Sequence, residues 1–181
     1  MPKILESVRE QLLETARRQI ETRGYAGTTV RSVATACGIA IGTVYNYFPS
    51  KDMLIASVVA EDWYACLAAM RGETATTLGG KAEACSDEEA EETLRRVYES
   101  LAAFAKRYEP LFSDKDAEKS YFSSLHERHA QLRGQLAERI LPLCRGEDPD
   151  FTARFLAEAL LTWTVAGVPF ERFYAVARKL L

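Results

Sequence analysis

The stretch that decides the fold is Gly38-Ile-Ala-Ile-Gly-Thr-Val-Tyr-Asn-Tyr-Phe-Pro-Ser-Lys51. It is too short and too aromatic for an ordinary surface helix, and it follows a small predicted helix over residues 29–37 that ends at Gly38. Two short helices joined by a tight turn that contains glycine are typical of a helix-turn-helix unit. The pattern predicts that this part of the chain contacts double-stranded DNA.

The other long segments have the periodicity of amphipathic helices, and none has a convincing strand pattern. Before the motif, apolar residues three or four apart predict a helix that ends at Gly24. After it, Pro49 ends one helix and Ser50 caps the next, over about residues 51–70. We predict an all-α fold, in which residues 71–87 form a loop. Further helices are predicted to begin at the Ser86/Glu89 capping box, at Asp114 or Asp116, at Asp148-Pro149 and at Pro169.

Charge is distributed unevenly along the chain. The 181 residues are 48% hydrophobic, which is enough for a core, and carry a net charge of -3. Residues 1–50 hold six Lys and Arg against four Asp and Glu, a net of +2, and residues 51–181 hold 17 against 22, a net of -5. A basic end on an acidic body suits a protein that presents that end to phosphates, although a bias this small has weight only together with the motif.

The chain has no secretory signal pattern and no run approaching 18 apolar residues, so we expect a soluble, cytoplasmic protein. The four cysteines are Cys37, Cys66, Cys85 and Cys144. They form no CxxC, which favours reduced thiols over disulfides or a zinc site, with redox sensing by Cys66 or Cys85 as the alternative. His126 and His129 lack the spacing of a metal site. We therefore expect no metal and no cofactor.

The run from Gly24 to Leu54 resembles the N-terminal domain of TetR-family transcriptional repressors, and the resemblance covers roughly residues 8–55. The positions that carry it are Gly24-Tyr25, Thr29, Val33-Ala34, Gly42, Val44-Tyr45, Tyr47-Phe48 and Lys51-Asp52. The rest of the chain is similar to the family only in helix content and length. The resemblance implies a helix-turn-helix DNA-binding domain of three helices over residues 1–49. It also implies a helical effector-binding and dimerisation domain over residues 50–181.

The chain departs from the family pattern at Ala40, where relatives usually carry Ser or another capping residue. Replacing a Ser cap by Ala costs about 1 kcal/mol of helix stability. The recognition helix is therefore expected to lack a side-chain cap, together with the phosphate contact that such a Ser makes.

Candidate DNA contacts follow from residue type and position. Gly42 lets the recognition helix approach base edges closely, Thr43 and Asn46 offer short polar groups, and Ile41 can touch a thymine methyl group. The candidate phosphate contacts are Thr28 or Thr29, Arg31, Tyr45, Tyr47 and Lys51. Packing alone is the alternative for the two tyrosines, and a solvated surface charge is the alternative for Arg31.

Lys51 lies in the first turn of a predicted helix, where a cation is unfavourable, and a DNA phosphate would resolve that conflict. The resemblance implies such a contact. Four apolar residues of the motif we assign to the small core behind it: Val33, Ile39, Val44 and Phe48.

The C-terminal region predicts a homodimer. No charged residue occurs from Ala159 to Phe170, so the helix there must be buried on several sides. A partner subunit can cover it, because helix-turn-helix proteins normally bind DNA with two-fold symmetry; burial in the chain's own core is the alternative. The candidate interface residues are Phe155, Ala159, Trp163, Phe170, Phe173, Tyr174 and Ala177.

An effector pocket is implied by the resemblance, together with a change in the spacing of the two DNA-reading heads when the effector binds. The candidate lining residues are too polar or too large for a routine core: Trp63, Tyr64, Cys66, Met70, Tyr98, Phe112, Tyr121, Phe122, His126 and Trp163. Rings with few charges favour a small apolar or aromatic effector, and ordinary core packing of these rings is the alternative.

We therefore expect a ligand-responsive transcriptional repressor that binds a palindromic operator as a homodimer, and not an enzyme. One alternative is a helical small-molecule-binding protein or enzyme in which the motif is fortuitous. No nucleophile–base pair, metal constellation or phosphate loop in the sequence supports it. The other alternative is a helical adaptor that dimerises without binding DNA.

Overall fold

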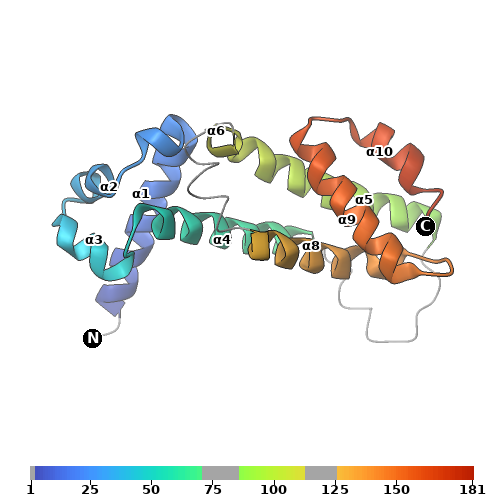
Figure 1. The fold of residues 1–181 in the computed structure, drawn as a ribbon, viewed down its shortest axis with the longest axis horizontal. Helices are drawn as coiled ribbons and strands as arrows, with labels where there is room; N and C mark the ends of the chain where they lie inside the picture. The colour runs from blue at the N-terminus through green and yellow to red at the C-terminus, as the bar shows by residue number, and fades with distance from the viewer. Residues whose placement is uncertain (1–2, 71–85, 113–125) are drawn as a thin grey trace. The chain divides into compact units, whose positions relative to one another are not determined.

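The computed structural model describes residues 3–70, 86–112 and 126–181, which form helices and no strand, as the sequence predicts (Figure 1). The chain divides into two compact units. Unit 1 comprises residues 1–63 and 107–125, and unit 2 comprises residues 64–106 and 126–181. The division of function between residues 1–49 and residues 50–181 stays a prediction.

Unit 1 contains the helix-turn-helix segment. Its described helices are α1 (Lys3–Gly27), α2 (Val30–Cys37), α3 (Ile41–Tyr47), most of α4 (Lys51–Ala69) and the short α6 (Glu109–Phe112). Unit 2 takes the end of α4, α5 (Asp87–Arg107), α8 (His126–Ile140), the 3-10 helix η4 (Leu141–Leu143), α9 (Pro149–Val165) and α10 (Phe170–Ala177). The loop predicted at residues 71–87 and the helix start at Asp114 or Asp116 lie largely or wholly outside the described residues.

Two glycines in the left-handed region shape the chain around α2. Gly24 (φ 66°) interrupts α1, so the predicted helix end is a kink, after which one more helical turn reaches Gly27. Gly38 (φ 67°, ψ 28°) ends α2, and its N–H donates to the carbonyls of Ala34 and Thr35. Residues with a Cβ adopt this conformation only at a cost. Gly38 therefore sets the direction in which the chain enters α3.

Side-chain caps begin four of the described helices: three lie at their predicted residues, and at α2 the structure selects Thr29 from the predicted pair Thr28 or Thr29. The pairs are Thr29 with Ser32 on α2, Ser50 with the Met53 amide on α4, Ser86 with Glu89 on α5, and Asp148 with the Phe151 amide on α9. At α3 the N-cap residue is Ala40, and no side chain caps the helix, as its sequence predicts. Of the two short helices in the motif, α3 therefore lacks a side-chain cap and α2 has one.

The core of unit 1 joins one face of α1 to the next three helices. Its fully buried members include Leu12, Leu13, Ala16, Ile20, Val33, Val44, Leu54, Ile55 and Val58. Phe48 is also buried, whereas Ile39 is only half-buried. The predicted core behind the motif is confirmed at Val33, Val44 and Phe48, which hold α2 and α3 against α1.

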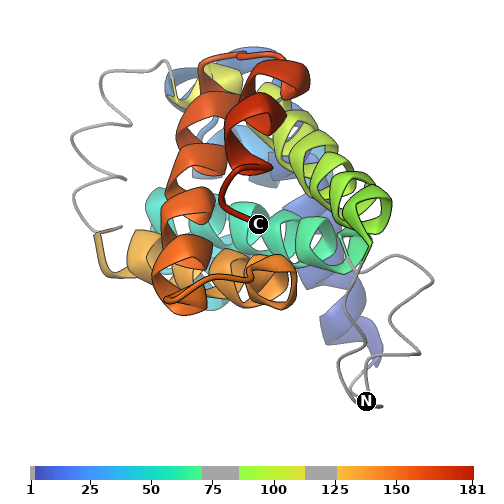
Figure 2. The same ribbon diagram turned by 90° about the vertical axis from the view of Figure 1, so that its right-hand side faces the viewer.

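Three helices of unit 2, α5, α9 and α10 (green, orange and red in Figure 2), contribute rings to an aromatic cluster in its core. The Tyr98 ring of α5 lies edge-on to Phe170 of α10, with centroids 5.5 Å apart, and 5.9 Å from Phe173. Trp163 of α9 meets Phe173 edge-on at 6.0 Å. Edge-to-face pairs of this kind add about 0.5–1.5 kcal/mol beyond their buried area. The cluster therefore fixes α10 on α5 and α9.

The caps of the motif give the first prediction. Ala40→Ser supplies the missing cap of α3 and is expected to raise the free energy of unfolding by about 0.5–1 kcal/mol. Thr29→Ala, the matched change on α2, removes an existing cap and should lower it by about 1 kcal/mol. Urea unfolding followed by circular dichroism measures both. A loss of stability in Ala40→Ser would contradict the assignment of residue 40 as the N-cap.

Candidate nucleic-acid interface

Helix α3 presents one face to solvent and the other to the core. Ile41, Gly42, Tyr45 and Asn46 are exposed, and Tyr45 retains 48% of its accessible surface, whereas Val44 retains none. Residues at positions i, i+1, i+4 and i+5 share one side of a helix, so these four form a continuous outward face. Thr43 and Tyr47 are half-buried at its borders. The structure thus places the predicted base-reading residues Ile41, Gly42 and Asn46 on one exposed face, with Tyr45 among them and Thr43 at its border.

Contacts with the described residues do not explain why a glycine occupies position 42 of α3. It is helical and has a negative φ, and a Cβ built on it would meet nothing within 4 Å. Glycine in a helix costs about 0.8–1 kcal/mol relative to alanine. The open space at this position is compatible with the predicted close approach of a base edge, which stays a prediction.

Thr28 and Thr29 occupy different environments, although the sequence left the choice between them open. Thr28 is fully buried, and its hydroxyl donates to the Gly24 carbonyl at 2.8 Å, so it does not face a DNA backbone. Thr29 is exposed, and its hydroxyl oxygen accepts a hydrogen bond from the Ser32 amide at 3.0 Å. The first amides of a helix lack intrahelical acceptors. Thr29 and the amide of exposed Arg31 therefore remain the phosphate candidates at this end of α2.

Lys51 has a partner inside unit 1. Its ammonium lies 3.6 Å from the centroid of the Tyr25 ring, and the Tyr25 hydroxyl donates to Asp52 at 2.6 Å. A cation over an aromatic face is attracted by the ring. The unfavourable position of Lys51 in the first turn is therefore relieved within the chain. A phosphate is not needed to resolve it, although the ring fixes where the ammonium lies.

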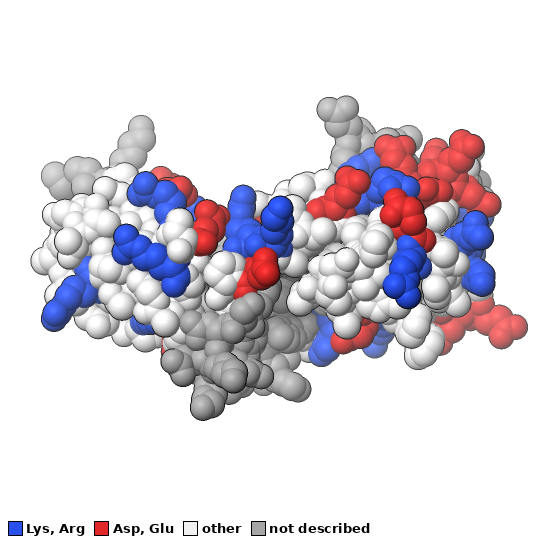
Figure 3. Space-filling view, turned by 90° about the horizontal axis from the view of Figure 1, so that it is seen from above, with Lys and Arg blue, Asp and Glu red and all other residues white. Residues whose placement is uncertain are grey.

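The motif carries no negative charge. From residue 22 to residue 51 the chain contains Arg23, Arg31 and Lys51 but no Asp or Glu. Figure 3 shows Lys and Arg atoms spread over the surface of unit 1 at the left, while acidic atoms are most numerous over unit 2 at the far right. Counting charge over all of residues 1–50 hid this signal, because the acidic residues of that range all precede residue 22.

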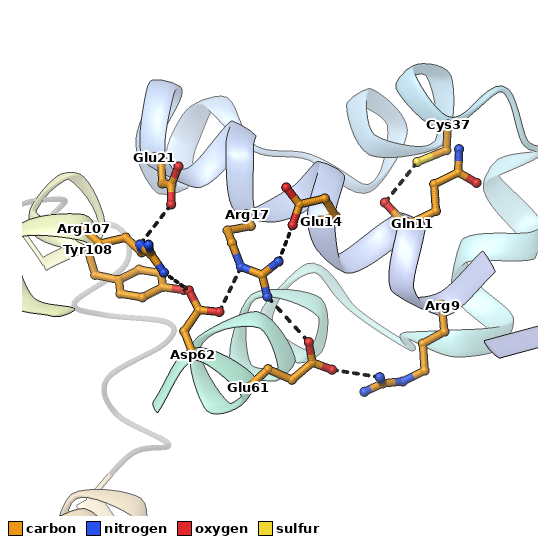
Figure 4. Close-up of polar contacts among 10 residues, drawn as sticks. All are labelled: Arg9, Gln11, Glu14, Arg17, Glu21, Cys37, Glu61, Asp62, Arg107 and Tyr108. Atoms are coloured by element: carbon orange, nitrogen blue, oxygen red, sulfur yellow. Dashed lines mark hydrogen bonds and ion pairs between the residues drawn. The ribbon is translucent and has the colours of Figure 1, made fainter. Parts of the chain in front are cut away.

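Polar side chains hold α2 on α1. The Ser32 hydroxyl donates to the buried Gln19 side chain at 2.6 Å, and the Cys37 sulfur lies 3.2 Å from the hydroxyl of buried Thr15. The Cys37 thiol also approaches the Gln11 carbonyl at 3.7 Å (Figure 4). Hydrogen bonds restrict orientation more than apolar contacts do, because they require a particular geometry. They therefore fix the register of α2 on α1.

The described buried cysteines have the environment of inert thiols. Burial raises the pKa of Cys66 and of Cys144 to about 11. The thiolate is the reactive form, so Cys66 is poorly suited to redox sensing at neutral pH. Cys85 lies outside the described residues.

The candidate effector residues are distributed over both units. Trp63 is buried in unit 1, and Cys66, Met70 and Tyr98 are buried in unit 2. Trp163 is half-buried, and Tyr64 is 58% exposed, which places it on the surface. Phe112 and His126 belong to α6 and α8, but their side chains are not described, and Tyr121 and Phe122 lie outside the described residues. The structure joins Tyr98 and Trp163 through Phe173 in the aromatic cluster.

A groove of about 600 Å³ lies between α8 and α9 in unit 2. Its lining residues are Ala130, Arg133, Gly134, Ala137, Glu138, Leu141, Asp150, Ala153, Arg154 and Glu158. None of them is a predicted effector residue, and half of them carry charge. This groove could not be predicted from the sequence, because small residues between charged ones look like an ordinary solvated helix face.

These observations define an all-helical protein with an N-terminal helix-turn-helix whose exposed face suits DNA. Residues 12–58 match the profile of the bacterial regulatory proteins of the tetR family. The chain is 37% identical to the HTH-type transcriptional repressor KstR2 of Mycolicibacterium smegmatis over 59 residues, which cover 32% of this chain and 29% of the relative. It is 25% identical over 140 residues to an uncharacterised HTH-type transcriptional regulator of Xanthobacter autotrophicus, covering 76% of this chain and 68% of that one.

The fold is similar along nearly the whole chain to a solved structure. This is a putative TetR-family regulator from Mesorhizobium loti, with a TM-score of 0.61, 21% identity and coverage of 93% of this chain and 95% of the other. The match to the tetR family of bacterial regulatory proteins is thus confined to residues 12–58, and the similarity over the rest of the chain is one of fold. Within the part of the chain that the structure describes, no helix is both long and apolar enough to cross a membrane.

Gly42→Ala separates stability from recognition. Alanine fits the open space and favours the helix, so the free energy of unfolding should rise by about 0.5–1 kcal/mol. The added methyl group should nevertheless weaken selective DNA binding by holding α3 away from the bases. Thermal unfolding and fluorescence anisotropy measure the two effects. A variant that is more stable and binds DNA as tightly as the wild type would contradict the role of Gly42.

Proposed function

We propose that this chain is a ligand-responsive transcriptional repressor, which binds a palindromic operator as a homodimer and is released by a small apolar or aromatic effector. The observation that carries the proposal is the exposed, acid-free face of α3, held on α1 through α2 and through its own buried residue Val44. A face of this kind can enter a major groove without repulsion from the phosphates.

Each half of the dimer would place one α3 in the major groove. Half-sites would lie on one face of the DNA, about one helical turn (~34 Å) apart or slightly more. Thr43 and Asn46 would meet base edges, with Ile41 against a thymine methyl group. The phosphate contacts would come from Thr29, Arg31, Tyr45, Tyr47 and Lys51, which position the protein without reading sequence.

Dimerisation is supported by an exposed apolar face on α9. Phe151 is 66% exposed, Phe155 is 51% exposed and Val165 is 62% exposed, at spacings that keep them on one side of the helix. Large exposed apolar side chains on a continuous face indicate a protein contact. Three other candidate interface residues, Phe170, Phe173 and Ala177, are buried within unit 2 itself. The proposed interface is therefore centred on Phe155, with half-buried Ala159, Trp163 and Tyr174.

Release would follow from a difference in affinity between two conformations. An effector that binds more tightly to a dimer with the wrong spacing of its two α3 helices lowers operator affinity by mass action. Coupling of this kind is typically worth 1–3 kcal/mol, or about 5–150-fold in affinity. The aromatic character of the unit 2 interior supports an apolar or aromatic effector.

Substitutions in α3 and at Lys51 should weaken DNA binding in different ways. Thr43→Ala or Asn46→Ala is expected to reduce affinity for the operator, by about 1–3 kcal/mol for a lost base contact, with little effect on unrelated duplexes. Lys51→Ala should reduce affinity for every duplex and make it less dependent on salt. Anisotropy titrations on the DNA that flanks the gene, at several salt concentrations, distinguish these effects. Unchanged operator affinity in both α3 variants would contradict the assignment of the recognition helix.

Phe155→Glu tests the dimer. A charge at the centre of the apolar face should convert the protein to a folded monomer and greatly reduce operator binding, because each subunit then holds one half-site alone. Tyr64→Glu, a matched change at another exposed aromatic residue of unit 2, is expected to leave the dimer intact. Sedimentation velocity measures the mass in solution. Dimeric Phe155→Glu protein would exclude this face as the interface.

A further inference from the structure

Asp62 of α4 is a buried carboxylate with three donors from two other segments of unit 1 (Figure 4). It is 8% exposed. Arg17 of α1 donates from Nε at 2.9 Å, Arg107 at the end of α5 donates at 2.9 Å, and the Tyr108 hydroxyl donates at 2.8 Å. We call these four residues the Asp62 cluster.

Further carboxylates surround the two arginines of the cluster. Arg17 also pairs with Glu14 and with Glu61, and Arg107 pairs with Glu21 at 3.2 Å. Burial lowers the pKa of Arg17, but the Asp62 and Glu14 carboxylates more than offset this, so its pKa is raised. Burial and the hydrogen bond to Asp62 raise the pKa of Tyr108. Both side chains therefore remain protonated donors at neutral pH.

The cluster uses more charge than a buried carboxylate requires. Arg17, whose side chain is 20% exposed, can neutralise Asp62 alone, and half-exposed Arg107 adds a second positive charge beside it. Buried ionic groups are in some proteins retained because they specify one geometry rather than because they add stability. The geometry that the Asp62 cluster specifies is the meeting of α1, α4 and the start of residues 107–112.

The Asp62 cluster lies where the chain passes between the two units. The chain leaves unit 1 after Trp63 and returns at Arg107. Asp62 is thus one residue before the exit, and Arg107 and Tyr108 are the first two residues on return. The cluster ties the exit and the return to each other and, through Arg17, to α1.

From Arg17 the connection continues to the DNA-binding helices. Thr15 and Gln19, two residues to either side on α1, contact Cys37 and Ser32 of α2. The turn at Gly38 then joins α2 to α3. The connection from Asp62 to α3 therefore consists of ion pairs, hydrogen bonds, helices and the Gly38 turn, all within unit 1.

We propose that Asp62 is the positioning residue of a clamp that transmits movements of α4 and α5 in unit 2 to α1, and thus to the recognition helix. The inference rests on the proposed function, because it assigns the route by which an effector in unit 2 would alter DNA binding. Asp62 itself touches neither DNA nor effector in this mechanism.

Amide hydrogen exchange in a double-mutant cycle tests the clamp without DNA or effector. Val97→Ala disturbs α5 within unit 2, where Val97 is buried. In the wild-type background this change should accelerate exchange of the α1 amides at residues 7–22 by about fivefold or more, as coupled sites do. In the Asp62→Asn background the same change should alter α1 exchange less than about twofold, because the route is cut.

Arg107→Gln provides a second variant. The Arg107 side chain is half exposed, so the variant protein is expected to fold. It should also interrupt transmission. Its matched control is Arg95→Gln, since Arg95 lies on the same helix and likewise pairs with two carboxylates, Glu91 and Glu171, but within unit 2. This control should leave transmission intact. An effect of Val97→Ala on α1 that is equal with and without Asp62 or Arg107 would overturn the proposal.

A DNA measurement separates the clamp from the proposed function. Wild-type protein should prefer an operator with the correct spacing over one with its half-sites moved by one base pair, and Asp62→Asn should reduce that preference while leaving non-specific affinity unchanged. An equal loss of affinity for both operators would indicate a merely structural role and overturn the proposal. A wild-type protein that selects no duplex would overturn the proposed function, and the exchange cycle would still decide the clamp.

Discussion

Helix α3 is seven residues long, and a helix of that length is not stable by itself in water. It lacks a side-chain cap and contains a glycine, so its intrinsic preference for the helix is weak. It persists because Val44 and Phe48 are buried in unit 1 and because Gly38 and Pro49 fix its ends. Everything proposed for the protein depends on this anchoring, which leaves the opposite face of α3 free to meet a partner.

The same constraint explains the polar groups behind the motif. Because α3 is held through α2 and α1, its position is only as well defined as the contacts between those helices. Gln19 with Ser32 and Thr15 with Cys37 supply directional contacts where apolar packing alone would permit sliding. The Asp62 cluster extends this directional chain to the segments that enter and leave unit 2.

The local features of the fold could be predicted from the sequence, because they depend on residues close together in the chain. The caps at Ser50 and Asp148 and the turn at Gly38 depend on residues within four positions of one another. The choice between Thr28 and Thr29 could not be made, since it depends on how the turn after Gly24 folds back. Composition predicts that the α9 face around Phe155 forms a dimer interface, but it cannot show that Phe170 and Phe173 turn inward.

The long-range ion pairs of Asp62 could not be predicted from the sequence, for a different reason. Asp62 lies 45 residues from Arg17 and from Arg107, and charged residues in helices usually face solvent. Nothing in the local pattern distinguishes Asp62 from the adjacent carboxylate Glu61, which is only half-buried. The absence of acidic residues from the motif is also hidden in a net charge taken over residues 1–50, because that range includes the acidic residues of α1. A net charge taken over residues 22–51 alone shows it.

The central claim is that the exposed face of α3 reads a two-fold symmetric DNA sequence. Selection of bound duplexes from a random-sequence pool, at about 0.15 M salt with excess competitor DNA, tests it whatever the operator sequence is. We predict enrichment of an inverted repeat whose half-sites lie about one helical turn apart, and loss of that enrichment in Thr43→Ala. A pool that remains random after repeated rounds would contradict the claim.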